Sequence, residues 1–139
     1  MVWNLMERKS KPHYYDRVGL FRMDVLYTGP IDIMSAGDAI VPDFLKSGGM
    51  NDRMFFGLFE YARVWATGRF GLVGTYLNYL HKRNEPIELH SESFMKFLMR
   101  GINVKEENIC FKRVRATGEI MNTDCKGSGF LRPVIYKYK

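Results

Sequence analysis

The chain has 139 residues, of which 46% are hydrophobic and 14% aromatic, and it carries a formal net charge of +6. This length suits one domain with a single core, and the apolar content excludes a largely disordered chain. No apolar stretch approaches the roughly 20 residues of a membrane-spanning helix, so we expect a soluble or peripheral protein. The basic balance favours acidic partners: nucleic acid, anionic lipid or an acidic protein.

The positive charge is concentrated towards the two ends of the chain. Nine Lys or Arg and four acidic residues lie between Arg100 and Lys139, which gives this stretch a net charge of +5. The first seventeen residues add a further +2, and the middle of the chain is close to neutral. Candidate binding residues are therefore sought near both ends.

In chain order, residues 1–17 are polar and basic, and we expect a flexible basic N-terminal arm. Residues 18–139 are expected to form the globular domain. Val18–Tyr27 alternates polar and apolar side chains and predicts a strand, which ends at the turn 28–30. Residues 31–45 are ambiguous between short helical pieces and irregular chain, and 46–49 is a flexible loop.

Asn51–Gly68 has the clearest helical pattern. Asn51 is a suitable N-cap, and Gly68 can close the C-terminus. Apolar side chains recur between them at helical spacing: Phe55, Leu58, Phe59, Ala62 and Trp65. The aromatic and aliphatic run Phe70–Leu80 that follows predicts a strand.

Short elements are expected in the rest of the chain. Ile87–His90 predicts a short strand, and a helix capped by Ser91 or Ser93 runs to Met99 and ends at Gly101. Residues 109–114 and 118–122 predict a strand or the arms of a bent hairpin. Residues 130–138 predict a last strand, at a sheet edge because it contains a proline.

Strands and helices alternate irregularly and without βαβ repeats. This order predicts an α+β fold: a single compact domain with a mostly antiparallel sheet packed with two main helices. We find no internal repeat and no linker between two cores.

A catalytic centre is difficult to build from these residues. Ser91 or Ser93 beside His90 could form a nucleophile and base, but helix capping explains both serines better. Cys110 and Cys125 match no zinc or redox spacing, and Cys110 is expected to be a small buried hydrophobe, while a disulfide between the two remains open. No glycine-rich stretch has the spacing of a phosphate or dinucleotide loop. We therefore expect a protein that is not an enzyme and has no cofactor.

Cations interleaved with aromatic rings mark residues 111–115 and 136–139. The candidate basic surface for lipid or nucleocapsid consists of Lys112, Arg113, Arg115, Lys137 and Lys139. Such strands can bind phosphates through the cations while the rings stack on bases. The alternative is an ordinary basic sheet face with aromatic side chains packed beneath it.

The N-terminal arm offers a candidate membrane contact. Trp3 and the cations Arg8, Lys9 and Lys11 could place an apolar tip among anionic headgroups, with each cation contributing about 1 kcal/mol. The alternative is an ordinary disordered terminus.

Two sequence segments resemble animal rhabdovirus matrix proteins. Residues 47–58, with Arg53, Met54, Gly57 and Leu58, resemble the loop and helix start of that family. Residues 98–105 resemble the end of the last large helix and the following strand, through the positions Leu98, Met99, Gly101 and Val104. The resemblance covers roughly residues 15–114. The arm lacks the Pro-Pro-x-Tyr and Pro-Thr/Ser-Ala-Pro motifs that recruit budding machinery.

The resemblance implies a viral matrix protein, a structural protein of the virion. Such a protein self-associates, condenses the nucleocapsid and links it to the inner face of the envelope membrane during assembly and budding. Its partners would be other copies of itself, the viral nucleocapsid and an anionic membrane surface. It would be located in the virion beneath the envelope, in the host cytoplasm and at the inner face of membranes. The alternative is a small basic viral RNA-binding protein, which the interleaved aromatic residues favour.

Overall fold

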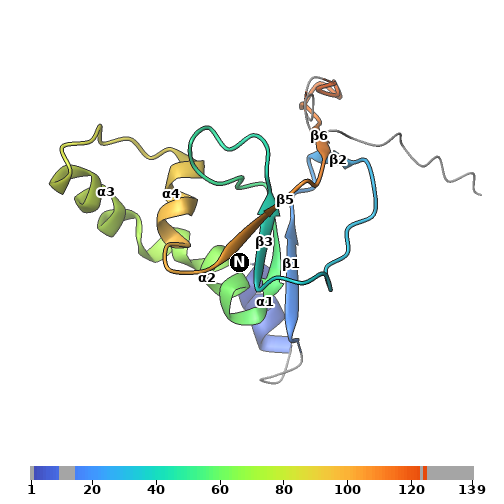
Figure 1. Cartoon of the computed structure of the whole chain (residues 1–139), viewed down its shortest axis with the longest axis horizontal. Coiled ribbons are helices and arrows are strands. Elements are labelled where there is room, and N and C mark those ends of the chain that lie inside the picture. Colours follow the sequence, from blue (N-terminus) through green and yellow to red (C-terminus); the bar gives the residue numbers. More distant parts are fainter. Residues whose placement is uncertain (1, 10–14, 123, 125–139) are drawn as a thin grey trace, which may run out of the picture.

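A computed structural model describes residues 2–9, 15–122 and 124 of the chain (Figure 1). The elements in chain order are α1 (Val2–Lys9), β1 (Arg17–Phe21), β2 (Val25–Tyr27), β3 (Ala39–Pro42), β4 (Met54–Leu58), α2 (Phe59–Gly71), α3 (Val73–Lys82), α4 (Ser91–Leu98), β5 (Val104–Glu107) and β6 (Phe111–Arg113). The α+β fold with one compact domain is confirmed. The described part contains four helices, where two main ones were expected.

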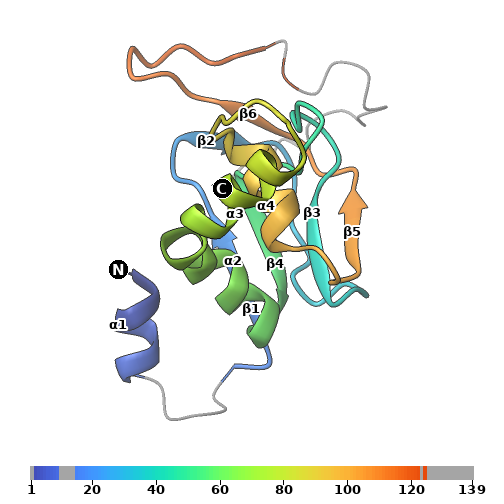
Figure 2. The ribbon, with the colours of Figure 1, turned by 90° about the vertical axis from the view of Figure 1, so that its left-hand side faces the viewer.

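The main sheet has the strand order β1-β4-β3-β5. β4 pairs antiparallel with both β1 and β3, whereas β3 and β5 are parallel. β2 and β6 form a separate antiparallel pair. Figure 2 shows α2, α3 and α4 in front of the main sheet, with β2 and β6 together near its upper end. The helices therefore cover one face of the sheet.

Both faces of the two central strands are buried. Along β4, Phe55 packs into the core beneath the helices, while Met54 and Phe56 belong to a second core with Phe111 of β6. β3 follows the same alternation, because successive side chains of a strand point to opposite faces. The β2–β6 pair thus covers the face that the helices leave open.

The predicted helix 51–68 is wrong in its first half. Met54–Leu58 is strand β4, and the helix begins only at Phe59. Asn51 does not cap a helix: its side-chain amide donates to the Phe44 carbonyl, and its Oδ1 accepts the Arg53 backbone N–H. Three consecutive buried side chains suit a strand covered on both faces, and they also fit a helical template.

The predicted strand 70–80 is also wrong, since Val73–Lys82 is helix α3. Its buried side chains Tyr76 and Leu80 are four residues apart, which is one helical turn. Residues 87–90 form no strand either. The strand predicted over 18–27 is divided into β1 and β2.

Of the two matrix-like segments, one has the expected structure. α4 ends at Leu98, Gly101 has a φ of +83° in the turn, and Val104 begins β5, so the helix-to-strand turn is present. The other segment is not a helix start, because Met54, Gly57 and Leu58 lie in β4. Residues 130–138 lie outside the described residues.

The N-terminal arm was expected to be flexible. Within it, residues 2–9 form α1, in which Trp3 is only 4% exposed and its ring lies 5.3 Å from that of Phe59. Burial of this large apolar side chain explains why the helix docks on α2. Residues 10–14 lie outside the described residues.

At Gly57, β4 approaches the backbone at the start of β3 so closely that there is no room for a side chain. A Cβ at this position would lie 2.2 Å from the carbonyl oxygen of Asp38. We expect Gly57→Ala to lower the free energy of unfolding by about 1–3 kcal/mol or more, because backbone cannot yield as a side chain can. Urea denaturation followed by circular dichroism measures this loss.

Gly74→Ala is the matched control. Gly74 lies in α3 with nothing within 4 Å of an added Cβ, so alanine there should be neutral or stabilise by about 0.5–1 kcal/mol. Equal stability of the two variants would contradict the packing of β4 against the chain before β3.

Candidate anion-binding groove

Tilted aromatic ring pairs hold α3 and α4 together. The ring of Tyr76 lies 4.9 Å from that of Phe94 and 5.0 Å from that of Phe97, and Tyr79 lies 5.0 Å from Phe97. Such ring pairs contribute beyond their buried area. Because the rings occupy the facing sides of both helices, the polar side chains of α3 and α4 are left at the margins of the contact.

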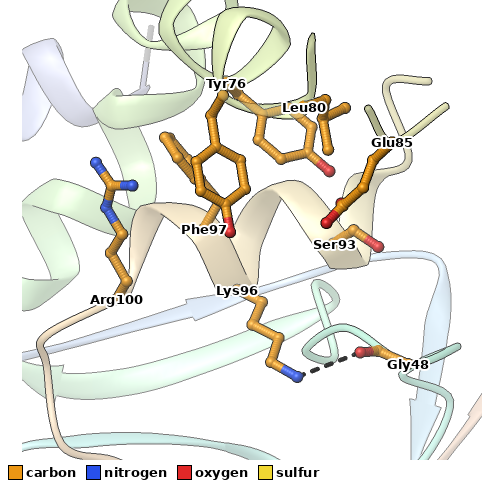
Figure 3. Close-up of a pocket in the computed structure, with 9 residues that line it drawn as sticks. Gly48, Tyr76, Leu80, Glu85, Ser93, Lys96, Phe97 and Arg100 are labelled. Atoms are coloured by element: carbon orange, nitrogen blue, oxygen red, sulfur yellow. Dashed lines mark hydrogen bonds between the residues drawn. The ribbon is translucent and has the colours of Figure 1, made fainter. Parts of the chain in front are cut away.

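A hollow of about 320 Å³ opens at one margin (Figure 3). Its lining residues are Gly48, Tyr76, Tyr79, Leu80, Glu85, Ser93, Lys96, Phe97 and Arg100. Lys96 is on α4 and Arg100 follows it by one helical turn. Figure 3 shows Arg100 at one end of the hollow and Glu85 and Ser93 at the other, with aromatic rings between.

A second hollow of about 310 Å³ adjoins the first. Its lining residues are Thr75, Asn78, Tyr79, Lys82, Phe97 and Arg100. The two hollows share Tyr79, Phe97 and Arg100, which together form the wall between them. We call the two hollows together the α3–α4 groove.

Three cations of the groove have no carboxylate partner among the described residues. Arg100 lies over the ring of Phe97, with its guanidinium carbon 4.0 Å from the ring centroid. Lys96 donates only to the backbone carbonyl of Gly48, at 3.4 Å, and Lys82 is exposed. The sole acid lining the groove, Glu85, is paired with Arg83 at 2.5 Å. The groove is therefore electropositive.

Tyr76 adds a neutral hydroxyl to the first hollow. Burial raises the pKa of Tyr76, and the nearby Glu85 carboxylate raises this pKa further, whereas a hydrogen bond with Ser93 opposes the shift. The phenol therefore stays protonated at neutral pH and can donate or accept a hydrogen bond.

Of the predicted basic surface on β6, the described part neutralises only Arg113. Arg113 donates from Nε and Nη2 to the two carboxylate oxygens of Asp124, at 2.9 and 2.7 Å. Lys112 donates to Asn122 Oδ1 at 2.9 Å, and Arg115 is exposed. Lys137 and Lys139 lie outside the described residues. Arg113 is thus held by an ion pair within the fold.

Of the predicted membrane residues, the structure describes only the side chain of Trp3. Trp3 is buried against Phe59 and cannot enter a bilayer while α1 stays docked. Arg8 and Lys9 belong to α1, but their side chains lie outside the described part, as does all of Lys11. In residues 2–9, 15–122 and 124, no helix is both long and apolar enough to cross a membrane.

His90 and Ser93 do approach each other, with 3.5 Å between Nδ1 and Oγ. Glu92 Oε2 lies 3.3 Å from the same nitrogen. A catalytic triad needs the acid and the nucleophile on opposite imidazole nitrogens, so this trio lacks that geometry. Neither serine caps α4, because the N-cap is His90 and makes no side-chain cap bond. Within the described residues, no cluster of three or more His, Cys, Asp or Glu could hold a metal.

The groove could not be predicted from a sequence in which 70–80 was expected to be a strand. On a helix, Thr75, Asn78 and Lys82 follow one another at spacings of three and four and lie on one face. Lys96 on α4 and Arg100, two residues after its end, are also four residues apart. The sequence signal for α3 was the helical spacing of its polar residues, next to the three-residue spacing of Tyr76 and Tyr79.

No protein-family model, curated protein or solved structure matches this chain. Any function must therefore be argued from the residues and their geometry.

The Arg113–Asp124 pair predicts an acid-sensitive contribution to stability. The hydrogen bond from Arg113 holds the pKa of Asp124 below its ordinary value of 3.8. A depressed carboxyl pKa stabilises the fold above the unfolded pKa, and this contribution disappears as the pH falls below 3.8 through the folded pKa.

We expect Asp124→Asn to lower the free energy of unfolding by about 2 kcal/mol at neutral pH, where the charge-assisted bonds are intact. The difference in the free energy of unfolding between this variant and wild type should shrink as the pH falls through the lowered pKa of Asp124. Urea titrations across acidic pH measure it, and a difference that is independent of pH would contradict the assignment.

Proposed function

We propose that this chain is a viral matrix-type structural protein that binds anionic partners through the α3–α4 groove. In this role it self-associates, condenses the nucleocapsid and links it to the inner face of the envelope membrane. The proposal combines the family resemblance of residues 15–114 with the electropositive groove. A site of this kind needs no catalytic group, and its chemistry is attraction between cations and phosphates.

One observation carries the proposal: three cations without an ion pair lie together at the groove, whereas most other cations of the described residues are paired, with Arg17, Lys112 and Arg115 as exceptions. Arg22 binds Asp24, Lys46 binds Glu106, and Arg113 binds Asp124. Lys82, Lys96 and Arg100 make no such ion pair within the described residues. Unpaired cations on one surface leave a local positive potential for an anionic partner.

Apolar side chains near the start of α3 support the membrane part of the proposal. Phe70 is 71% exposed and Leu72 is 40% exposed, at the turn that leads from α2 into α3. Exposed apolar side chains that precede the helix carrying Lys82 suit shallow contact with an anionic bilayer. Self-association is supported by β1 and β5, which are the two edge strands of the main sheet.

The alternative is a small viral RNA-binding protein. It is favoured by the combination of rings and unpaired cations in one groove, which single-stranded nucleic acids use for stacking and for phosphate contacts. The two functions differ in their dependence on lipid: only the matrix function requires binding to anionic vesicles.

A triple charge reversal, Lys82→Glu with Lys96→Glu and Arg100→Glu, tests the proposal. We expect wild-type protein to float with anionic vesicles and to bind single-stranded RNA, both in a salt-dependent manner. The triple variant should lose at least about a hundredfold in affinity for vesicles, since each cation contributes about 1 kcal/mol. Liposome flotation and RNA titration measure both affinities.

Lys112→Glu with Arg115→Glu is the matched control on the predicted β6 surface. It reverses two charges without breaking the Arg113–Asp124 pair, and should bind much as wild type does. Loss of binding in this control, with the groove variant unaffected, would place the anionic partner on β6. Wild-type protein that binds RNA but never floats would favour the alternative function.

A further inference from the structure

The first hollow of the groove has two chemically different ends. Arg100 lies at one end, and Glu85 and Ser93 lie at the other (Figure 3). Lys96 lies between them, and its Nζ reaches towards the Gly48 carbonyl. A ligand that fills this hollow should therefore be anionic at one end and carry hydrogen-bond donors at the other.

The walls between these ends are aromatic. Tyr76, Tyr79 and Phe97 line the hollow, and its volume of about 320 Å³ is at the small end of the range for ligand sites. One flat heterocyclic ring is a suitable occupant for such a space. A lipid headgroup supplies the phosphate but no ring to contact these walls.

Glu85 retains a carboxylate oxygen that accepts no hydrogen bond from the described residues. Its Oε1 accepts from Arg83 Nε, whereas no hydrogen bond is made by Oε2. The carboxylate is partly exposed, so it can turn towards a ligand. A carboxylate oxygen accepts readily from the exocyclic amino group of a base such as cytosine.

We infer that the first hollow of the α3–α4 groove binds one nucleotide of a single-stranded RNA. Arg100 and Lys96 bind the phosphate, the aromatic walls contact the base, and Glu85 accepts a hydrogen bond from the amino group of the base. Bases that carry an amino group are preferred over uracil, which has a carbonyl oxygen at the same place. The inference rests on the proposed function, because it uses two of the same cations.

The test compares two oligonucleotides of equal length, oligo(C) and oligo(U), which differ at position 4 of the base. Fluorescence anisotropy with full-length protein should give roughly tenfold tighter binding of oligo(C), the size of one specific base contact. Glu85→Gln should remove most of this preference, because an amide can donate to uracil as well as accept from cytosine.

Two variants separate base recognition from charge and from the Arg83 pair. Glu88→Gln changes the net charge equally, at an exposed acid that does not line the hollow, and should keep the preference. Arg83→Gln breaks the pair while leaving the carboxylate in place, and should weaken both oligonucleotides without altering their ratio.

Equal affinity for oligo(C) and oligo(U) would overturn the inference, as would loss of preference in Glu88→Gln. Cytidine monophosphate should displace the oligomer only at much higher concentration, because it lacks neighbouring phosphates. Displacement at equal nucleotide concentration would assign the hollow to a free nucleotide and overturn the assignment to a strand. If no oligonucleotide binds but the triple variant still loses flotation, the inference fails while the proposed function stands.

Discussion

Burial of β4 on both faces is the constraint on which the arrangement of this domain depends. Met54, Phe55 and Phe56 are each at most 1% exposed, yet they point alternately to opposite sides of the sheet. One side must therefore be covered by helices and the other by the β2–β6 pair. The close approach of Gly57 to the Asp38 carbonyl holds β4 at the distance that both cores require.

The groove follows from the way in which the helices cover this sheet. α2 packs on β1 and β4, and α4 packs on α2, so α3 contacts the domain mainly through its rings. The aromatic side chains of α3 and α4 pack together in this contact and most of them line the first hollow, and Lys82, Lys96 and Arg100 lie at its borders. The ring contacts thus position cations that no carboxylate of the described residues neutralises, and this local electrostatic property is what favours an anionic partner.

The sequence allowed the fold class to be predicted, but not several of its elements. Period-two alternation identified β1, and the turn at Gly101 identified the passage from α4 into β5. Residues 54–56 could not be assigned correctly, because an apolar run that is buried on both faces has no period that separates strand from helix. The aromatic residues of α3 favour a strand by their intrinsic preference, but this preference is weaker than the packing that makes the segment a helix. The pairing of Arg113 with Asp124 could not be predicted either, because this contact spans eleven residues and has no sequence signature.

The location of the anionic partner is the central claim, and amide hydrogen exchange tests it most directly. Wild-type protein would be compared alone, with single-stranded RNA and with anionic vesicles. The account predicts slower exchange in residues 73–100 upon binding, together with little change in residues 111–122. Protection confined to residues 111–122, with 73–100 unchanged, would contradict binding in the groove and indicate that the partner binds at β6.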